Sequence, residues 1–306
     1  MTTALITIAI PTYNNEKTIR KAIDSCLSQN DLEDCEILVV NNASEDSTGE
    51  ILASYGDKVR VVTNDETVSL FENHNVALKH SLGRYVIFCH SDDVLYPDAT
   101  QILKKRLAEL HYPAKFICWG HSHFRDFSAS LIKCGFETGR VFAGQYAVNP
   151  FLHSGLTPSG TCYSKSILNV GGFLPVQHRL APSDASSMVN AALHGFSFEM
   201  LPAILFKRTT ASTLVSSTRQ NDAYEGYSNA FSNLFEVIGN EQTAELIQST
   251  YMSVEPPLKF YQVASRSFPQ LVFKRLLRFV IFNPVLLLKK QTFRIFATTL
   301  SRIFNA

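Results

Sequence analysis

The chain has 306 residues, of which 45% are hydrophobic and 18% are charged, with 28 Lys and Arg against 27 Asp and Glu. This balance excludes a disordered protein, a collagen-like repeat and a generic nucleic-acid binder. The charges are unevenly placed, because every Asp and Glu lies at or before Glu255. Residues 1–255 hold 19 basic and 27 acidic residues, a net charge of −8, whereas residues 256–306 carry +9. We therefore expect an acidic body followed by a basic tail.

The cysteines and the apolar segments near the two ends indicate a cytoplasmic protein. Six cysteines are scattered without a CxxC pair, which favours reduced thiols in the cytosol. Residues 4–10 read as a strand that no basic leader precedes, so no signal peptide is expected. The apolar segment 279–288 has only ten residues and contains Asn283-Pro284, whereas a membrane span needs about 20 residues.

The first hundred residues alternate between strand and helix patterns. Strands are predicted at residues 5–10, 36–40, 59–62 and 85–89, and helices at 19–27, before Tyr55 and at 75–81. This alternation predicts an α/β fold with a mostly parallel sheet covered on both faces. Ligands bind such sheets at the carboxyl ends of the strands. The corresponding segments here are residues 11–15, 41–46 and 90–93.

The pattern changes in the second half of the chain. A helix is expected at 99–110, a strand at 116–119, and, after a less regular stretch, a helix at 186–194 and a strand at 197–205. From about residue 216 helical periodicity takes over, and Phe231, Leu234 and Ile238 share one face of a helix. We expect a catalytic domain at residues 1–215 and a helical extension at 216–306, basic and amphipathic from 256.

Two adjacent carboxylates, Asp92 and Asp93, follow the buried strand at 85–89. Such neighbours repel each other unless a cation neutralises them. Mg²⁺ or Mn²⁺ fits this role, because a hard cation takes one or two carboxylates and fills its other positions with phosphate oxygens and water. The alternative is a loop in which an Asp caps the next helix.

Four segments of the first 97 residues form an ordered set of motifs. They are P-x-Y-N after an apolar strand (8–15), V-N-N-x-S-x-D-x-T (40–48), N-V-A-L-x-x-S-x-G-x-Y (75–85) and H-x-D-D before a proline (90–97). Together they resemble the family 2 glycosyltransferases. The resemblance covers about residues 4–210 and leaves the basic tail outside.

The resemblance implies a GT-A fold and transfer of a sugar, with inversion, from a nucleotide diphosphate sugar to an acceptor hydroxyl. Position by position, it implies that Pro11, Thr12 and Tyr13 line the base pocket and that Asn41 or Asn42 meets a uracil or thymine edge. Asp92 would approach the ribose or the diphosphate, and Asp93 would ligate the metal.

The resemblance also implies a catalytic base in the second half of the chain. The family has a glycine-glycine-phenylalanine turn, here at residues 170–175, and then an acidic pair where this chain has Ser183-Asp184. Asp184 is therefore the candidate base, and the alternative is that Ser183 and Asp184 cap the following helix. His153 falls where the family builds its acceptor pocket, and an ordinary loop role for it stays open.

Three positions depart from the family pattern. Asn41-Asn42 replaces an acidic residue with amides, which still offer a donor and an acceptor to a pyrimidine edge. His90 occupies the first acidic position of D-x-D-D and is either a metal ligand or a lining residue. His74 stands where an Arg often precedes the Asn of the third motif.

The tail from 271 to 303 mixes large apolar residues with seven basic residues and no acid. Such helices lie at the surface of anionic membranes, and the alternative is a hairpin that completes the core or forms a dimer. The sequence thus predicts a metal-dependent inverting glycosyltransferase, peripheral on the inner face of the cell membrane, with a lipid-linked or oligosaccharide acceptor. The competing hypothesis is a non-catalytic sugar-nucleotide-binding protein or scaffold of the same fold.

Overall fold

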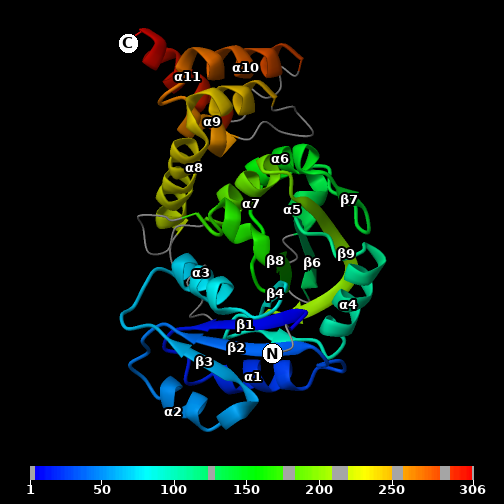
Figure 1. Ribbon diagram of the computed structural model, residues 1–306. Helices are drawn as coiled ribbons and strands as arrows, with labels where there is room; N and C mark the ends of the chain where they lie inside the picture. Colours follow the sequence, from blue (N-terminus) through cyan, green and yellow to red (C-terminus); the bar gives the residue numbers. More distant parts are fainter. Residues whose placement is uncertain are drawn as a thin grey trace.

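The computed structural model describes residues 4–122, 128–174, 183–208, 220–249, 258–282 and 290–304. Within these ranges nine strands form one sheet in the order β3-β2-β1-β4-β8-β6-β9-β5, with β7 paired to β9. The sheet curls around the helices that it carries on one face (Figure 1). The expected α/β architecture is confirmed.

The first four strands of the chain form the parallel half of the sheet. They are β1 (Ile6–Thr12), β2 (Cys35–Asn41), β3 (Arg60–Thr63) and β4 (Tyr85–Phe88). Every residue of β1 is buried, because successive side chains point to opposite faces and helices cover both. Ile8 packs with α1 (Ile19–Leu27) on one face, and Ala9 packs with α3 (Leu70–His80) on the other. A short helix α2 (Thr48–Ala53) and a 3₁₀ turn (Gly56–Lys58) connect β2 to β3.

The second half of the sheet is mixed. Its strands, with the helices that connect them, are in chain order β5 (Val94–Leu95), α4 (Ala99–Glu109), β6 (Phe116–Ser122), α5 (Ser128–Lys133), β7 (Val141–Phe142), α6 (Gly144–His153), β8 (Thr161–Ser164), a 3₁₀ turn (Lys165–Val170), α7 (Asp184–Leu193) and β9 (Ser197–Lys207). The four-residue β8 lies between β4 and β6 and runs antiparallel to both, whereas β6 and β9 are parallel. The strand order therefore joins the two halves through a strand too short to stand out in the sequence.

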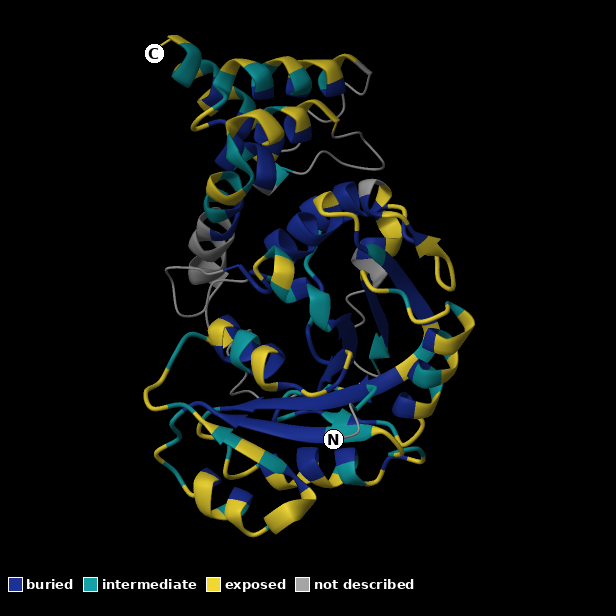
Figure 2. Ribbon diagram, in the orientation of Figure 1, coloured by how far each residue is buried: buried dark blue, intermediate teal, exposed yellow. Residues whose placement is uncertain are grey.

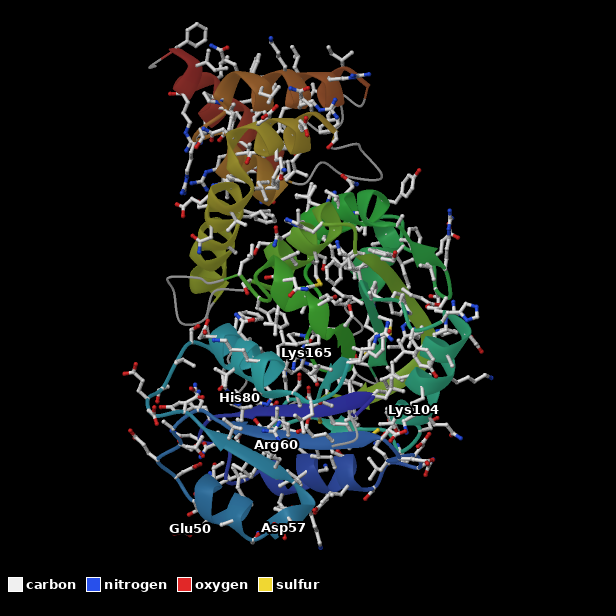
Figure 3. All side chains as sticks on the ribbon, viewed as in Figure 1. Glu50, Asp57, Arg60, His80, Lys104 and Lys165 are labelled. Atoms are coloured by element: carbon white, nitrogen blue, oxygen red, sulfur yellow. The ribbon has the colours of Figure 1, made fainter. Side chains whose placement is uncertain are left out.

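Ion pairs and side-chain hydrogen bonds close the amino-terminal edge of the parallel strands. Arg60 bonds Glu36 at 2.6 Å and also the carbonyl oxygen of His80. Lys165 reaches the carbonyl oxygen of Ser81 from the start of the turn after β8 (Figure 3). This edge is thus tied together by the chain's own groups, and the opposite edge, at the carboxyl ends of the strands, is where the sequence places the site.

In the described part of the chain after the sheet, the helices are α8 (Gln220–Ser249), kinked at Gly239, then α9 (Leu258–Ala264), α10 (Pro269–Phe282) and α11 (Lys290–Phe304). Phe231 and Leu234 of α8 are fully buried, as the helical pattern predicted, and they join the same core as α6 and α7. Helices α9 to α11 stack beyond α6, far from the parallel strands (Figure 1), and their outward faces are exposed (Figure 2). Among the described residues, no helix has the length and apolarity that crossing a membrane requires.

Candidate active site

The carboxyl ends of β1 and β2 lie side by side, with Thr12 opposite Asn41 in the register of the two strands. Both side chains are buried. The loops that follow are joined to each other, because the backbone N–H of Glu16 donates to Asp46 at 3.0 Å and that of Asn15 donates to Thr48 Oγ1 at 2.9 Å. Desolvation raises the pKa of Asp46, but hydrogen bonds from Thr48 and Glu16 outweigh this effect and hold that pKa below its usual value. The polar motif after β2 therefore fixes the loop after β1.

The two asparagines at the end of β2 have different surroundings. The side-chain oxygen of Asn42 accepts hydrogen bonds from Asn64 Nδ2 at 2.8 Å and from the backbone N–H of Val68 at 2.9 Å, and its Nδ2 donates to the Val68 carbonyl at 2.9 Å. The Asn41 side chain instead accepts one hydrogen bond, from the Ser44 N–H at 3.1 Å. Asn42 thus holds the loop before α3, and Asn41 is the better placed of the two to meet a ligand.

The two adjacent aspartates lie in the turn between β4 and β5. His90, Asp92 and Asp93 each offer a ligand atom, and these atoms all lie within 4.8 Å of one another. The Asp93 N–H donates to the His90 carbonyl at 2.9 Å, and Asp93 is only 4% exposed. Two carboxylates with an imidazole form a donor set that suits Mn²⁺ and related divalent cations. The residues therefore fit a metal, and they include both aspartates that the sequence singled out.

His74 of α3 contacts His90, the histidine of this group. Its Nδ1 lies 2.7 Å from the Leu70 carbonyl oxygen, and its Nε2 lies 3.1 Å from His90 Nε2. The His74 ring packs against Phe88 and Phe173, with ring centroids 4.9 and 5.5 Å away. Burial, with a smaller contribution from His90, lowers the pKa of His74 to about 3, so this ring is neutral at physiological pH. The sequence did not predict this contact.

A pair of hydrogen bonds joins the third motif to the glycine-glycine-phenylalanine turn. Asn75 donates to the Phe173 carbonyl at 2.8 Å and accepts from the Phe173 N–H at 2.8 Å. Gly172 has a φ of +63°, and a Cβ there would come within 2.4 Å of the Asn75 oxygen. Because only glycine fits this approach, the turn holds Phe173 against His74.

Asp184 is the first residue of α7, and its carboxylate is partly buried. The backbone of Gly155 lies directly against it, since a Cβ at position 155 would come within 2.3 Å of Asp184 Oδ2. Burial, and then the nearby charge of Asp184, raise the pKa of Tyr163 well above its usual value. Ser183 precedes the helix but makes no side-chain capping hydrogen bond. His153 ends α6 two residues before Gly155.

Of the predicted site residues, the structure brings Thr12 beside Asn41 on β1 and β2, and Asp92 beside Asp93 after β4. Pro11 and Thr12 are the last two residues of β1, both buried, and Tyr13 follows the strand. Asp184 begins α7 and His153 ends α6. The close approach of Gly155 and the position of Tyr163 were not predicted.

Solved structures share this arrangement, and it is the GT-A fold of glycosyltransferases. Staphylococcus aureus TarS in complex with UDP-GlcNAc matches 96% of this chain and 90% of its own, with a TM-score of 0.65 at 18% identity. The mannosyltransferase PcManGT from Pyrobaculum calidifontis, in complex with GDP-Man and Mn²⁺, matches with a TM-score of 0.53 at 17% identity and covers 96% of this chain and 83% of its own. At these identities the likeness shows the fold alone.

The sequence comparisons point to one family. The profile of Glycosyl transferase family 2 matches residues 7–128 and supports a family 2 glycosyltransferase domain in this part of the chain. An uncharacterized glycosyltransferase of Rickettsia prowazekii is 29% identical over 205 residues, which are 67% of this chain and 52% of that protein. The UDP-Glc:alpha-D-GlcNAc-diphosphoundecaprenol beta-1,3-glucosyltransferase WfgD of Escherichia coli is 34% identical over 91 residues, 29% of this chain and 36% of that protein. The chain thus spans about half the length, or less, of these relatives.

Proposed function

We propose that this protein transfers a glycosyl group, with inversion, from a UDP-linked sugar to a hydroxyl of a lipid-linked glycan. The observation that carries the proposal is the meeting of the β1, β2 and β4 ends with a metal-binding group, in a chain whose residues 7–128 match this family. TarS was solved with UDP-GlcNAc, and WfgD is named for UDP-Glc and a diphosphoundecaprenol acceptor, which supports both parts of the assignment. A dTDP-linked sugar is the other pyrimidine donor to be tested.

The donor nucleotide would bind at the ends of β1 and β2. Thr12 is 2% exposed, and its hydroxyl has no hydrogen-bond partner among the residues that the structure describes. Because buried polar groups are nearly always bonded, this hydroxyl favours a polar ligand at the site. In the proposal Pro11, Thr12 and Tyr13 line the base, and the amide of Asn41 meets the pyrimidine edge with a donor and an acceptor. Asp92 faces the ribose or the diphosphate.

Asp93 and its neighbours in the turn after β4 would hold Mg²⁺ or Mn²⁺. When bound, such a cation neutralises the charge of the departing diphosphate. The chain's own contribution at this point is a buried carboxylate, fixed by the turn hydrogen bond between the Asp93 N–H and the His90 carbonyl. The described residues thus need no large movement to present a ligand there.

Asp184 would accept the proton of the acceptor hydroxyl. Its carboxylate lies against the Gly155 backbone and near enough to Tyr163 to raise the pKa of that phenol. It stands at the start of a helix whose positive end favours a carboxylate in its proton-accepting form. One carboxylate is enough for a single displacement, because the diphosphate leaves without a protein acid. His153, near Gly155, would line the acceptor pocket.

The proposal assigns residues 1–215 to catalysis and residues 216–306 to attachment at an anionic membrane. On α10 and α11 the exposed apolar side chains are Leu277, Ile281, Phe293 and Phe304, and the exposed basic ones are Lys274, Arg278, Lys290 and Arg294. A cavity of about 570 Å³ between α9 and α11 contains Lys290 and Arg294 in its lining. A surface that is both apolar and basic suits the interface of an anionic leaflet, and it would place the enzyme at the inner face of the cell membrane, beside a lipid-linked acceptor.

The catalytic part of the proposal is tested with Asp184→Asn. We expect the rate of transfer to fall by about 10²- to 10⁴-fold, the usual contribution of a general base, with Mn²⁺-dependent binding of UDP retained. Ser183→Ala is the matched control, since Ser183 makes no capping hydrogen bond through its side chain. If Asp184→Asn turns over at the wild-type rate, Asp184 is not the base. If the wild type binds UDP-sugars without any turnover, the protein is the non-catalytic binder that His90 and Asn41 would favour.

A further inference from the structure

The contact between His74 and His90 defines which ring nitrogen of His90 is left to bind a metal beside Asp93. What we infer from this contact rests on the proposed function. His74 Nδ1 lies 2.7 Å from the Leu70 carbonyl oxygen. A carbonyl oxygen only accepts, so His74 Nδ1 carries a proton and donates it.

The two rings share one hydrogen bond. The two Nε2 atoms lie 3.1 Å apart, so one of them must carry the proton. A proton on His74 Nε2 would make that ring a cation. His74 is 1% exposed and is enclosed by the rings of Phe71, Phe88 and Phe173, where an isolated charge is costly. The proton therefore belongs to His90 Nε2, and His74 Nε2 accepts it.

With its proton on Nε2, a neutral His90 has an unprotonated Nδ1, which is the form that binds metals. Nδ1 lies 3.9 Å from Asp93 Oδ2. This distance is too long for a hydrogen bond, yet two ligand atoms that share one ion through bonds of about 2.1 Å can be up to about 4.2 Å apart.

We propose that His90 is a nitrogen ligand of the divalent cation, and that His74 is a positioning residue that fixes its ring and tautomer. Histidine ligands commonly donate their other ring N–H to a second group, and this outer contact fixes the ring for the metal. Here the outer group is another imidazole, itself fixed by the Leu70 carbonyl and by Phe173, which Asn75 and Gly172 hold in place.

A nitrogen donor changes the choice of metal. Carboxylate and water ligands suit Mg²⁺ and Mn²⁺, whereas imidazole suits later transition metals and is a poor partner for Mg²⁺. The site is therefore selective for Mn²⁺ or Co²⁺ over Mg²⁺. Aspartate at position 90 would remove this selectivity, because it restores an oxygen donor.

Pulsed electron paramagnetic resonance of Mn²⁺ bound to the full chain tests the ligand directly. Spectra are recorded with Mn²⁺ alone and with Mn²⁺ plus UDP. We expect the modulation of a directly bound imidazole ¹⁴N in the wild type and its loss in His90→Asp. Mn²⁺ that binds without this modulation overturns the inference and leaves the proposed function standing. Absence of Mn²⁺ binding under both conditions overturns both.

Metal titrations by calorimetry test the role of His74. Removing an outer partner of a ligand usually weakens metal affinity by about 10- to 100-fold, and we expect this loss of Mn²⁺ affinity in His74→Phe. His80→Phe, at the exposed end of the same helix, is the matched control and should bind as the wild type does. His90→Asp should raise the affinity for Mg²⁺ relative to Mn²⁺. An unchanged Mn²⁺ affinity in a folded His74→Phe protein would show that His74 does not position the ligand.

Discussion

The backbone of Gly155 lies against the carboxylate of Asp184, so close that a Cβ on residue 155 would come within 2.3 Å of Oδ2. Gly155 follows α6, and Asp184 begins α7. The approach therefore fixes the candidate base relative to the loop that the proposal assigns to the acceptor. No side chain larger than hydrogen fits without moving the carboxylate.

Gly155→Ala should displace the Asp184 carboxylate and leave the nucleotide site intact. Misplacing a reacting group by about 1 Å costs about 10²-fold in rate, and we expect a loss of this order in kcat. Initial rates at saturating donor, together with UDP binding, separate the two effects. Gly49→Ala is the control, because a Cβ at residue 49 meets open space. A Gly155→Ala protein with wild-type kcat would contradict the role of Asp184.

Asn75→Ala should destabilise the fold. Asn75 bonds both the N–H and the carbonyl of Phe173 at 2.8 Å, and truncation would leave two largely buried backbone groups without partners. Each such group costs about 1–3 kcal/mol, so the free energy of unfolding should fall by at least about 2 kcal/mol. Urea denaturation measures the change. Alanine at the exposed Asn30 should leave the unfolding midpoint within error, and an equal midpoint for both variants would refute the bridge.

His74 should make the fold sensitive to mild acid. Its pKa is about 3 in the folded protein and 6.5 ordinarily, so the unfolded chain binds the proton first. The stability that neutral His74 contributes is complete above pH 6.5 and is lost as the pH falls toward 3, by up to about 1.4 kcal/mol per pH unit. Urea unfolding between pH 6.5 and 5, with EDTA present, should show a steeper loss for the wild type than for His74→Phe. Parallel pH profiles would contradict the burial of a neutral ring.

Removal of exposed apolar groups from α10 and α11 should weaken membrane docking. Ile281 and Phe293 are 66% and 59% exposed, and serine at both positions should reduce cosedimentation with vesicles that contain an anionic phospholipid. Binding should also weaken at high salt, because the basic residues are screened. Leu82→Ser is the control, since Leu82 is 60% exposed in the parallel half. A wild-type protein that ignores these vesicles at low salt, or that elutes as a dimer which the two serines dissociate, would contradict attachment.

The sequence predicted the parallel half of the sheet well. Hydrophobic runs end at polar motifs there, and the strands at β1, β2 and β4 lie within two residues of their expected bounds. The second half was harder, because β8 has four residues and pairs with strands distant in the chain. The helix α6 carries Pro150 and follows several glycines, so its pattern was not visible.

The site was predicted in its residue types more than in its contacts. Asp92 and Asp93 stood out because adjacent carboxylates after a buried strand are unusual, whereas the internal role of Asn42 depends on a loop 22 to 26 residues away. The contact of His74 with His90 had one signal in the sequence: two positions depart from the family pattern together, and both become histidine. A pair separated by 16 residues on a helix and a strand end is recognised as a contact only in the folded chain.

Turnover of sugar nucleotides by the wild-type chain tests the central claim most directly. A panel of UDP-, dTDP- and GDP-linked sugars is incubated with Mn²⁺ and membranes that contain lipid-linked glycans, and release of the nucleotide diphosphate is measured. We predict Mn²⁺-dependent release from a UDP-sugar, abolished by EDTA and by Asp184→Asn. Absence of release from every sugar nucleotide in the panel would contradict the assignment as a glycosyltransferase.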